Sequence, residues 1–294
     1  VEGGIAGVHI TSPVVSLPAI ERLLALNAAA EGLMVVVDDP ANVAALGHAL
    51  ADSAKPLTVI IDVDPGIRRT GVPSAEAAVA LARAIAEQPG LTYRGVQFYC
   101  GMQQHIEDFA QRRAAIEERT AYLQTVIAAL SEAGFTPEIV TGSGTGTHAI
   151  DLELGVFTEL QTGSYVFMDR QYLDCDLTGT GDGPFETALF VDARVVSAGG
   201  PGMATLDAGF KALATDGGPP RVASGADGAT FIFMGDEHGA ILGPAPDTRH
   251  AIGDAVTLIV PHCDPTVNLY DSYHVVEGDT LVDIWPVSAR GRSR

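Results

Sequence analysis

The chain has 294 residues, with 37 aspartates and glutamates against 17 lysines and arginines, so its formal net charge is −20. This negative charge argues against nucleic acid and anionic membranes as partners. No apolar run approaches the roughly 20 residues that a membrane span needs, and three scattered cysteines without a CxxC pair exclude a disulfide framework. We therefore expect a cytoplasmic protein with no nucleic-acid or membrane partner.

Short apolar runs alternate with alanine-rich amphipathic stretches through the first 170 residues. Strands are predicted at 7–11, 33–39, 57–64, 94–99, 137–141 and 158–167, and the longest helix at about 106–133. Near-continuous hydrophobic strands that alternate with helices are typical of a parallel α/β domain.

Six predicted strands leave two architectures open. A (β/α)₈ barrel needs eight strands, whereas an open doubly wound sheet tolerates six. No GxGxxG motif follows the first strand, and the glycine-rich loops "TGSGTGT" (141–147) and "TGSY" (162–165) follow the last two strands instead. Barrels often build a phosphate site from the loops after strands 7 and 8. The pattern therefore favours a barrel whose first two strands are missing from this chain.

The character of the sequence changes at about residue 173. Helical periodicity fades, and short strand-like runs appear, such as "ETALFVDARVVSA", "ATFIFMGDE", "AVTLIVP" and "TLVDIWPV". We predict two domains, an α/β barrel domain over 1–172 and a β-rich domain over 173–294.

Four motifs in loops offer polar side chains, and each has a structural and a functional interpretation. "TGSGTGT" could cradle an anion with backbone N–H groups and hydroxyls, or be a flexible loop. "DPGIRRTG" (64–71) could present Arg69 to a ligand or to solvent. In "QFYCGMQQH" (97–105), Tyr99 and His105 are predicted on one face, where His105 could transfer protons or be structural. "MGDEHG" (234–239), with Asp236, is ordinarily a solvated turn.

A fifth motif, "PHCDPT", follows the predicted strand "AVTLIV" (255–260). Because side chains alternate along a strand, His262 and Asp264 would point one way and Cys263 the other. An imidazole and a carboxylate on one face could be two metal ligands, or a chance pair on a surface turn.

Together these segments resemble the D-threonine aldolase and D-serine dehydratase family, pyridoxal-phosphate enzymes with the alanine-racemase type of fold. The resemblance covers nearly the whole chain. It rests on "DxGxxRxG" (64–71), on "VQFYCG" with His105 four residues later, and on "TGSGTGT", "ELQTGSYVFMD", "DEHG" and "PHCDPT" in that order.

The resemblance implies a role for each motif. Arg69 would face the pyridine nitrogen of the cofactor, and Tyr99 would line its pocket. His105 would take the proton of the substrate β-hydroxyl, with Asp236 at the edge of the site. His262 and Asp264 would bind a divalent metal close to that hydroxyl. Phosphate contacts would come from two loops, at Ser143, Gly144, Thr145, Gly163, Ser164 and Tyr165.

The resemblance also implies the reaction. Dehydratases of this family carry His and Cys at the metal positions, whereas the aldolases carry His and Asp, as His262 and Asp264 are here. We therefore expect retro-aldol cleavage of D-threonine and related D-β-hydroxy-α-amino acids to glycine and an aldehyde. Mn²⁺ is the metal favoured, with Co²⁺, Mg²⁺ and Zn²⁺ as alternatives. The alternative reaction is dehydration of D-serine or 3-hydroxyaspartate, and a homodimer stays open.

One part of the family pattern is absent. The family attaches its cofactor to a lysine of the first barrel strand, and the two lysines here, Lys55 and Lys211, stand elsewhere in the sequence. The chain also opens on Val1, within a strand–helix pattern. We expect that about two β/α units precede it, and that the chain alone lacks activity without them. A non-catalytic protein that binds cofactor or metal is a third interpretation.

Overall fold

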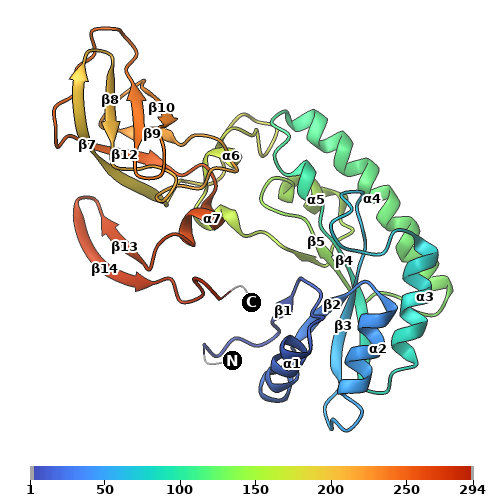
Figure 1. Cartoon of the computed structure of the whole chain (residues 1–294). Coiled ribbons are helices and arrows are strands. Elements are labelled where there is room, and N and C mark those ends of the chain that lie inside the picture. The colour runs from blue at the N-terminus through green and yellow to red at the C-terminus, as the bar shows by residue number, and fades with distance from the viewer. Residues whose placement is uncertain (1–2, 293–294) are drawn as a thin grey trace. The chain divides into compact units, whose positions relative to one another are not determined.

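The computed structural model describes residues 3–292, and the chain divides into two compact units between Thr162 and Gly163 (Figure 1). The boundary predicted from sequence, between 172 and 173, lies ten residues further along the chain. Among residues 3–292, no helix combines the length and the apolar character that a membrane crossing requires.

The first unit alternates strands and helices. Its elements are β1 (His9–Ile10), α1 (Leu17–Ala29), β2 (Met34–Val37), α2 (Pro40–Ala49), β3 (Leu57–Asp62), α3 (Ala75–Ala86), β4 (Leu91–Phe98), η1 (Gly101–Gln103), α4 (Phe109–Glu132), β5 (Ile139–Gly142), α5 (His148–Leu154) and β6 (Glu159–Leu160).

Each strand of this unit pairs in parallel with the next strand along the chain, so the sheet order is β1-β2-β3-β4-β5-β6. A doubly wound sheet would reverse its strand order at a switch point, whereas a barrel adds each strand beside the last. The predicted barrel architecture is confirmed, in the form of an open, six-stranded part of a barrel.

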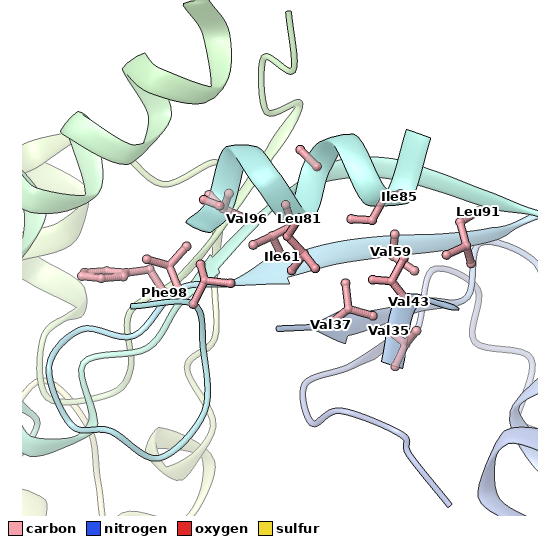
Figure 2. Close-up of a cluster of buried hydrophobic side chains, with 14 of the residues drawn as sticks. Val35, Val37, Val43, Val59, Ile61, Leu81, Ile85, Leu91, Val96 and Phe98 are labelled. Atoms are coloured by element: carbon pink, nitrogen blue, oxygen red, sulfur yellow. The ribbon is translucent and has the colours of Figure 1, made fainter. Parts of the chain in front are cut away.

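The two faces of this sheet carry different side chains. On the helix side, Val35, Val37, Val59 and Ile61 join Leu81 and Ile85 of α3 in a buried apolar cluster (Figure 2). The alternate positions Met34, Val36, Ile60 and Ile139 form a smaller cluster on the opposite face. Two residues further on, that opposite face becomes polar, with Asp62 following Ile60 and Thr141 following Ile139. Polar groups therefore gather at the carboxyl ends of the strands.

The second unit is β-rich, as predicted. It contains η2 (Ser164–Val166), α6 (Arg170–Leu173), β7 (Phe190–Gly200), β8 (Met203–Leu206), β9 (Arg221–Ser224), β10 (Thr230–Phe233), β11 (Gly239–Leu242), β12 (Ala255–Ile259), α7 (Cys263–Val267), β13 (Ser272–Glu277) and β14 (Thr280–Pro286). Strands β10-β11-β8-β7-β12-β9 close into an antiparallel barrel, and β13 and β14 form a separate hairpin.

The prediction of a strand at 158–167 is wrong for most of these residues. Only Glu159 and Leu160 pair with β5. From Gly163 the chain turns, because the N–H groups of Val166 and Phe167 bond back to the carbonyls of Gly163 and Ser164. These local hydrogen bonds form a 3₁₀ turn in place of sheet pairing.

Candidate functional site

A hydrogen-bonded polar layer crosses the carboxyl ends of β3, β4 and β5. The Gln97 side-chain amide donates to Asp62 Oδ1 at 3.0 Å and to the Thr11 carbonyl at 3.2 Å. The Gln161 amide donates to Gln97 Oε1 and to Thr141 Oγ1, each at 3.1 Å. No sequence motif identified this polar layer. Strand alternation from Ile60 and Ile139 nevertheless indicates two of its residues, Asp62 and Thr141.

Asp62 is the buried acid of this layer. Burial raises the pKa of Asp62, although hydrogen bonds from Thr70 and Gln97 and the charge of Arg69 oppose the rise. The charge of Arg69 therefore acts on Asp62 of this polar layer.

The "DxGxxRxG" loop folds around Asp64. Its Oδ1 accepts hydrogen bonds from the backbone N–H groups of Gly66 at 2.8 Å and Arg68 at 2.9 Å. The N–H of Gly71 donates to Asp38 Oδ2 at 2.9 Å, which ties the end of the loop to the segment after β2. With both ends of the loop held, the Arg69 guanidinium lies 5.4 Å from the centroid of the Tyr99 ring. The structure thus brings together two residues predicted from separate motifs.

The "TGSGTGT" loop is packed, not flexible. Ser143, Thr145 and Thr147 are buried, and Ser143 has a left-handed backbone with φ +67°. A loop of this kind can present successive N–H groups to an anion. The Ser143–Thr145 segment, predicted to hold a phosphate, is therefore an ordered turn at the carboxyl end of β5.

Gln104 fastens this loop to the one that follows β4. Its Oε1 accepts from Gly146 N at 3.0 Å, and its Nε2 donates to Thr147 Oγ1 at 3.1 Å and to the Cys100 carbonyl at 3.2 Å. A Cβ at Gly144 or Gly146 would overlap Gln104, so the loop needs glycine at both places. Sequence reasoning missed Gln104, which is buried next to the predicted base, His105.

Asp151 of α5 lies beneath the same loop and is only 3% exposed. Burial raises the pKa of Asp151, and hydrogen bonds from Thr147 and Ser143 oppose the rise. The two hydroxyl side chains therefore have a buried acceptor within the protein. His105 itself is half-buried in the turn between η1 and α4.

Contrary to the prediction from sequence, His262 and Asp264 do not lie on a strand. β12 ends at Ile259, and Pro261 has no N–H with which to continue the ladder. His262 precedes the short helix α7, and Thr266 Oγ1 donates to its carbonyl at 2.7 Å. The two side chains nevertheless meet, with His262 Nε2 lying 3.6 Å from Asp264 Oδ2.

This pair has the chemistry of a metal site. Zinc bonds to imidazole nitrogen and carboxylate oxygen are about 2.0–2.2 Å long, so one ion can contact both atoms across this separation. The carboxylate of Asp264 raises the pKa of His262 to about 9, against the effect of burial, and Asp216 adds to the rise. The imidazole in turn lowers the pKa of Asp264. No cluster of three or more His, Cys, Asp or Glu side chains suited to a metal occurs within residues 3–292.

Cys263 points elsewhere. Its side chain is buried in the apolar core of the second unit, and burial raises the pKa of its thiol to about 12. The hydroxyl of Ser164 hydrogen-bonds to that thiol, and the Cys263 N–H donates to Asp169 Oδ2 at 2.9 Å. One predicted phosphate residue, Ser164, therefore lies beside the predicted metal motif. Of its neighbours, Gly163 begins the second unit, and the Tyr165 ring lies 5.3 Å from that of Phe185.

Asp236 lies in the turn between β10 and β11. Its carbonyl accepts from Lys211 N at 3.0 Å, so this turn packs against the segment that begins at Gly209. The same segment reaches α7, where Ala214 N donates to Thr266 Oγ1 at 3.1 Å. Residues 209–216 thus link the "DEHG" turn to the His262 motif, a link that no sequence motif indicated.

Neither lysine occupies the carboxyl end of a barrel strand. Lys55 precedes β3 and caps α1, since its Nζ donates to the carbonyls of Asn27, at 2.7 Å, and Ala30. Lys211 forms an exposed ion pair with Glu237. Both lysines therefore have structural or surface positions.

Comparison with known proteins identifies the fold and its relatives. Residues 5–171 match the family described as "Alanine racemase, N-terminal domain", and residues 188–276 match the "Putative serine dehydratase domain". The chain is 37% identical to the 3-hydroxy-D-aspartate aldolase of Paracoccus denitrificans strain Pd 1222, over 99% of this chain and 75% of that protein. It is 36% identical to the D-threonine aldolase of an Arthrobacter species, over 100% of this chain and 76% of that protein.

A solved structure agrees with these matches. The crystal structure of D-threonine aldolase from Filomicrobium marinum superimposes with a TM-score of 0.94 at 34% identity, covering 100% of this chain and 79% of the other. An alanine-racemase type of family implies pyridoxal phosphate as the cofactor. The chain belongs to the D-threonine aldolase and D-serine dehydratase family, and within that family it is an aldolase-like carbon–carbon lyase.

Proposed function

We propose that the protein catalyses retro-aldol cleavage of D-threonine and related D-β-hydroxy-α-amino acids to glycine and an aldehyde, with pyridoxal phosphate and a divalent metal. The observation that carries the proposal is the imidazole–carboxylate pair, His262 Nε2 at 3.6 Å from Asp264 Oδ2, with the intervening cysteine buried. Two relatives are named for D-threonine and 3-hydroxy-D-aspartate. Both of these amino acids carry a β-hydroxyl, the group that a metal held by this pair would bind.

The residues of each unit fit the two groups that this reaction needs. Pyridoxal phosphate would supply an electron sink for the charge left at the substrate Cα, and a divalent ion would supply a Lewis acid at the β-hydroxyl. His262 and Asp264 would hold the ion, and Mn²⁺ suits a mixed nitrogen and carboxylate set. In the first unit, the Ser143–Thr145 turn would contact the phosphate, and the family resemblance implies further phosphate contacts at Gly163, Ser164 and Tyr165.

Arg69 would set the protonation state of the cofactor's pyridine nitrogen. A guanidinium carries only donors, so an Arg facing the pyridine nitrogen requires that nitrogen to be an unprotonated acceptor. The contact of Arg69 with the Tyr99 ring supports this role, because it holds the guanidinium in one place. A cofactor whose pyridine nitrogen is unprotonated is a weaker electron sink.

His105 would take the proton from the substrate β-hydroxyl oxygen, since histidine is the side chain suited to proton transfer near neutral pH. Asp236 would lie at the edge of the site. Its turn is joined to α7 through residues 209–216, which supports a position near the metal pair.

Dehydration is the second candidate, because residues 188–276 match a serine dehydratase domain. It would eliminate the β-hydroxyl and leave the Cα–Cβ bond intact. The burial of Cys263 favours the aldolase, since a side chain packed in the apolar core is not presented to an ion held by His262 and Asp264.

The test is the metal dependence of D-threonine consumption by the full-length protein. Chelation of the metal should abolish consumption, and Mn²⁺ should restore it. A His262→Ala variant should lose about 10²–10³ in rate, the usual effect of removing one transition-state stabiliser. His274→Ala, which removes an exposed histidine of β13, is the matched control and should keep the wild-type rate. Metal-dependent consumption that survives in His262→Ala would contradict the proposal.

A further inference from the structure

A fixed segment of the second unit lies against the His262 motif. At one end, Ala214 N donates to Thr266 Oγ1 at 3.1 Å, and the same hydroxyl donates to the His262 carbonyl at 2.7 Å. At the other end, Gly217 is so close to the chain that a Cβ there would lie 2.9 Å from the Pro261 carbonyl oxygen. A hydrogen bond at Ala214 and close backbone packing at Gly217 therefore flank Thr215 and Asp216 and hold this segment in place.

Asp216 extends from this segment to the imidazole. Its Oδ2 lies 2.6 Å from His262 Nδ1, on the ring nitrogen that does not face Asp264. The Asp216 side chain is 55% exposed and that of His262 24%. Exposed ion pairs of this kind usually contribute little to stability. Fold stabilisation is therefore a weak reason for holding a solvent-exposed carboxylate in this position.

We propose that Asp216 is a positioning residue for the metal site: it accepts the Nδ1 proton of His262 and so directs the Nε2 lone pair toward the ion shared with Asp264. This inference rests on the proposed metal pair. A carboxylate on the far nitrogen fixes the tautomer and ring orientation of a ligating histidine and makes it a stronger donor. Asp216 contacts the imidazole and not the ion, so its effect passes through His262.

The attachments explain why this carboxylate can act at all. An Asp on a free loop would lose side-chain and backbone entropy each time it met the ring. Here the hydrogen bond from Ala214 to Thr266 and the close packing of Gly217 against Pro261 restrain the backbone on both sides of Asp216, so this entropy is already lost when the protein folds. The geometry is therefore present before any metal binds.

The experiment measures the dissociation constant of Mn²⁺ alone for the full-length protein, without substrate, by electron paramagnetic resonance of free Mn²⁺. Asp216→Ala should weaken Mn²⁺ binding about 10–100-fold, the usual effect of losing such a partner. Asp216→Asn should lie between wild type and Asp216→Ala, because an amide oxygen still accepts from Nδ1–H. Asp271→Ala removes an equal charge from an exposed ion pair with Arg290 and is the matched control, with unchanged binding expected.

A second readout separates positioning from general electrostatics. In the Zn²⁺-loaded protein, long-range proton–nitrogen NMR should show the proton of His262 on Nδ1, and Asp216→Ala should broaden or shift that signal. Unchanged Mn²⁺ affinity in Asp216→Ala, beside lost affinity in His262→Ala, would overturn this inference and leave the metal pair standing. Equal weakening by Asp216→Ala and Asp271→Ala would overturn it too. Unchanged affinity in His262→Ala would overturn the proposed metal pair itself.

Discussion

Cys263 separates the two proposed metal ligands in sequence, but in the structure it is a core residue. It is 1% exposed, and burial raises the pKa of its thiol to about 12. Burial therefore disfavours the thiolate, which is the form that reacts readily or binds metals. Strand alternation predicted the separation of Cys263 from His262 and Asp264 correctly, yet the physical reason is the start of a helix.

We predict that Cys263 is neither reactive nor a metal ligand. At pH 8 the native protein should react with a thiol reagent at Cys263 only after denaturant is added. Cys263→Ala should keep the wild-type Mn²⁺ affinity, whereas Asp264→Ala should lose most of it. Equal losses in the two variants would show that the thiol binds the metal.

Residues that support the candidate site but belong to no sequence motif could not be predicted from the sequence. Asp216 stands 46 positions before His262, in a glycine-rich stretch with no hydrophobic period. Gln104 sits beside the predicted base, but its partners lie 42 and 43 positions away on the loop after β5. Contacts at such separations depend on tertiary packing, which local pattern does not encode.

At the scale of elements, hydrogen bonds of Gln104 hold the loop after β4 and the loop after β5 together. Its side chain satisfies a backbone N–H, a hydroxyl and a carbonyl in a buried place. An unsatisfied buried polar group costs about 1–3 kcal/mol. The loop over residues 141–147 is therefore held in shape by a residue outside its own sequence.

We predict that Gln104→Leu lowers the free energy of unfolding by about 1–3 kcal/mol and weakens pyridoxal phosphate binding in the same protein. Urea denaturation and absorbance titration with the cofactor measure the two effects. Gln124→Leu, on the exposed side of α4, makes the same chemical change and should alter neither. A Gln104→Leu protein with wild-type cofactor affinity would show that the loop holds its shape unaided.

The elements themselves followed from sequence to differing degrees. The continuous apolar runs at 33–39 and 57–64 contain β2 and β3, because strands buried on both faces leave an unmistakable pattern. The stretch at 158–167 is mostly polar up to Ser164 and holds only two strand residues, since 3₁₀ hydrogen bonds after Gly163 replace sheet pairing. Short apolar runs near a glycine do not by themselves distinguish these outcomes.

At the scale of the whole molecule, glycine-rich loops late in the strand series predicted the barrel order that the sheet has. The β-rich second unit was also expected, but its barrel was not, because β12 pairs with β7 and β9 across long separations in the sequence. The reaction class came from the family resemblance, and the comparisons support it. The choice between breaking the Cα–Cβ bond and eliminating the hydroxyl rests on His262, Asp264 and the buried Cys263.

The products formed from D-threonine test that choice most directly. The full-length protein, supplied with pyridoxal phosphate and Mn²⁺, should convert D-threonine to glycine and acetaldehyde in equal amounts, with no 2-oxo acid. Formation of 2-oxobutanoate and ammonia without glycine would contradict the account and establish a dehydratase.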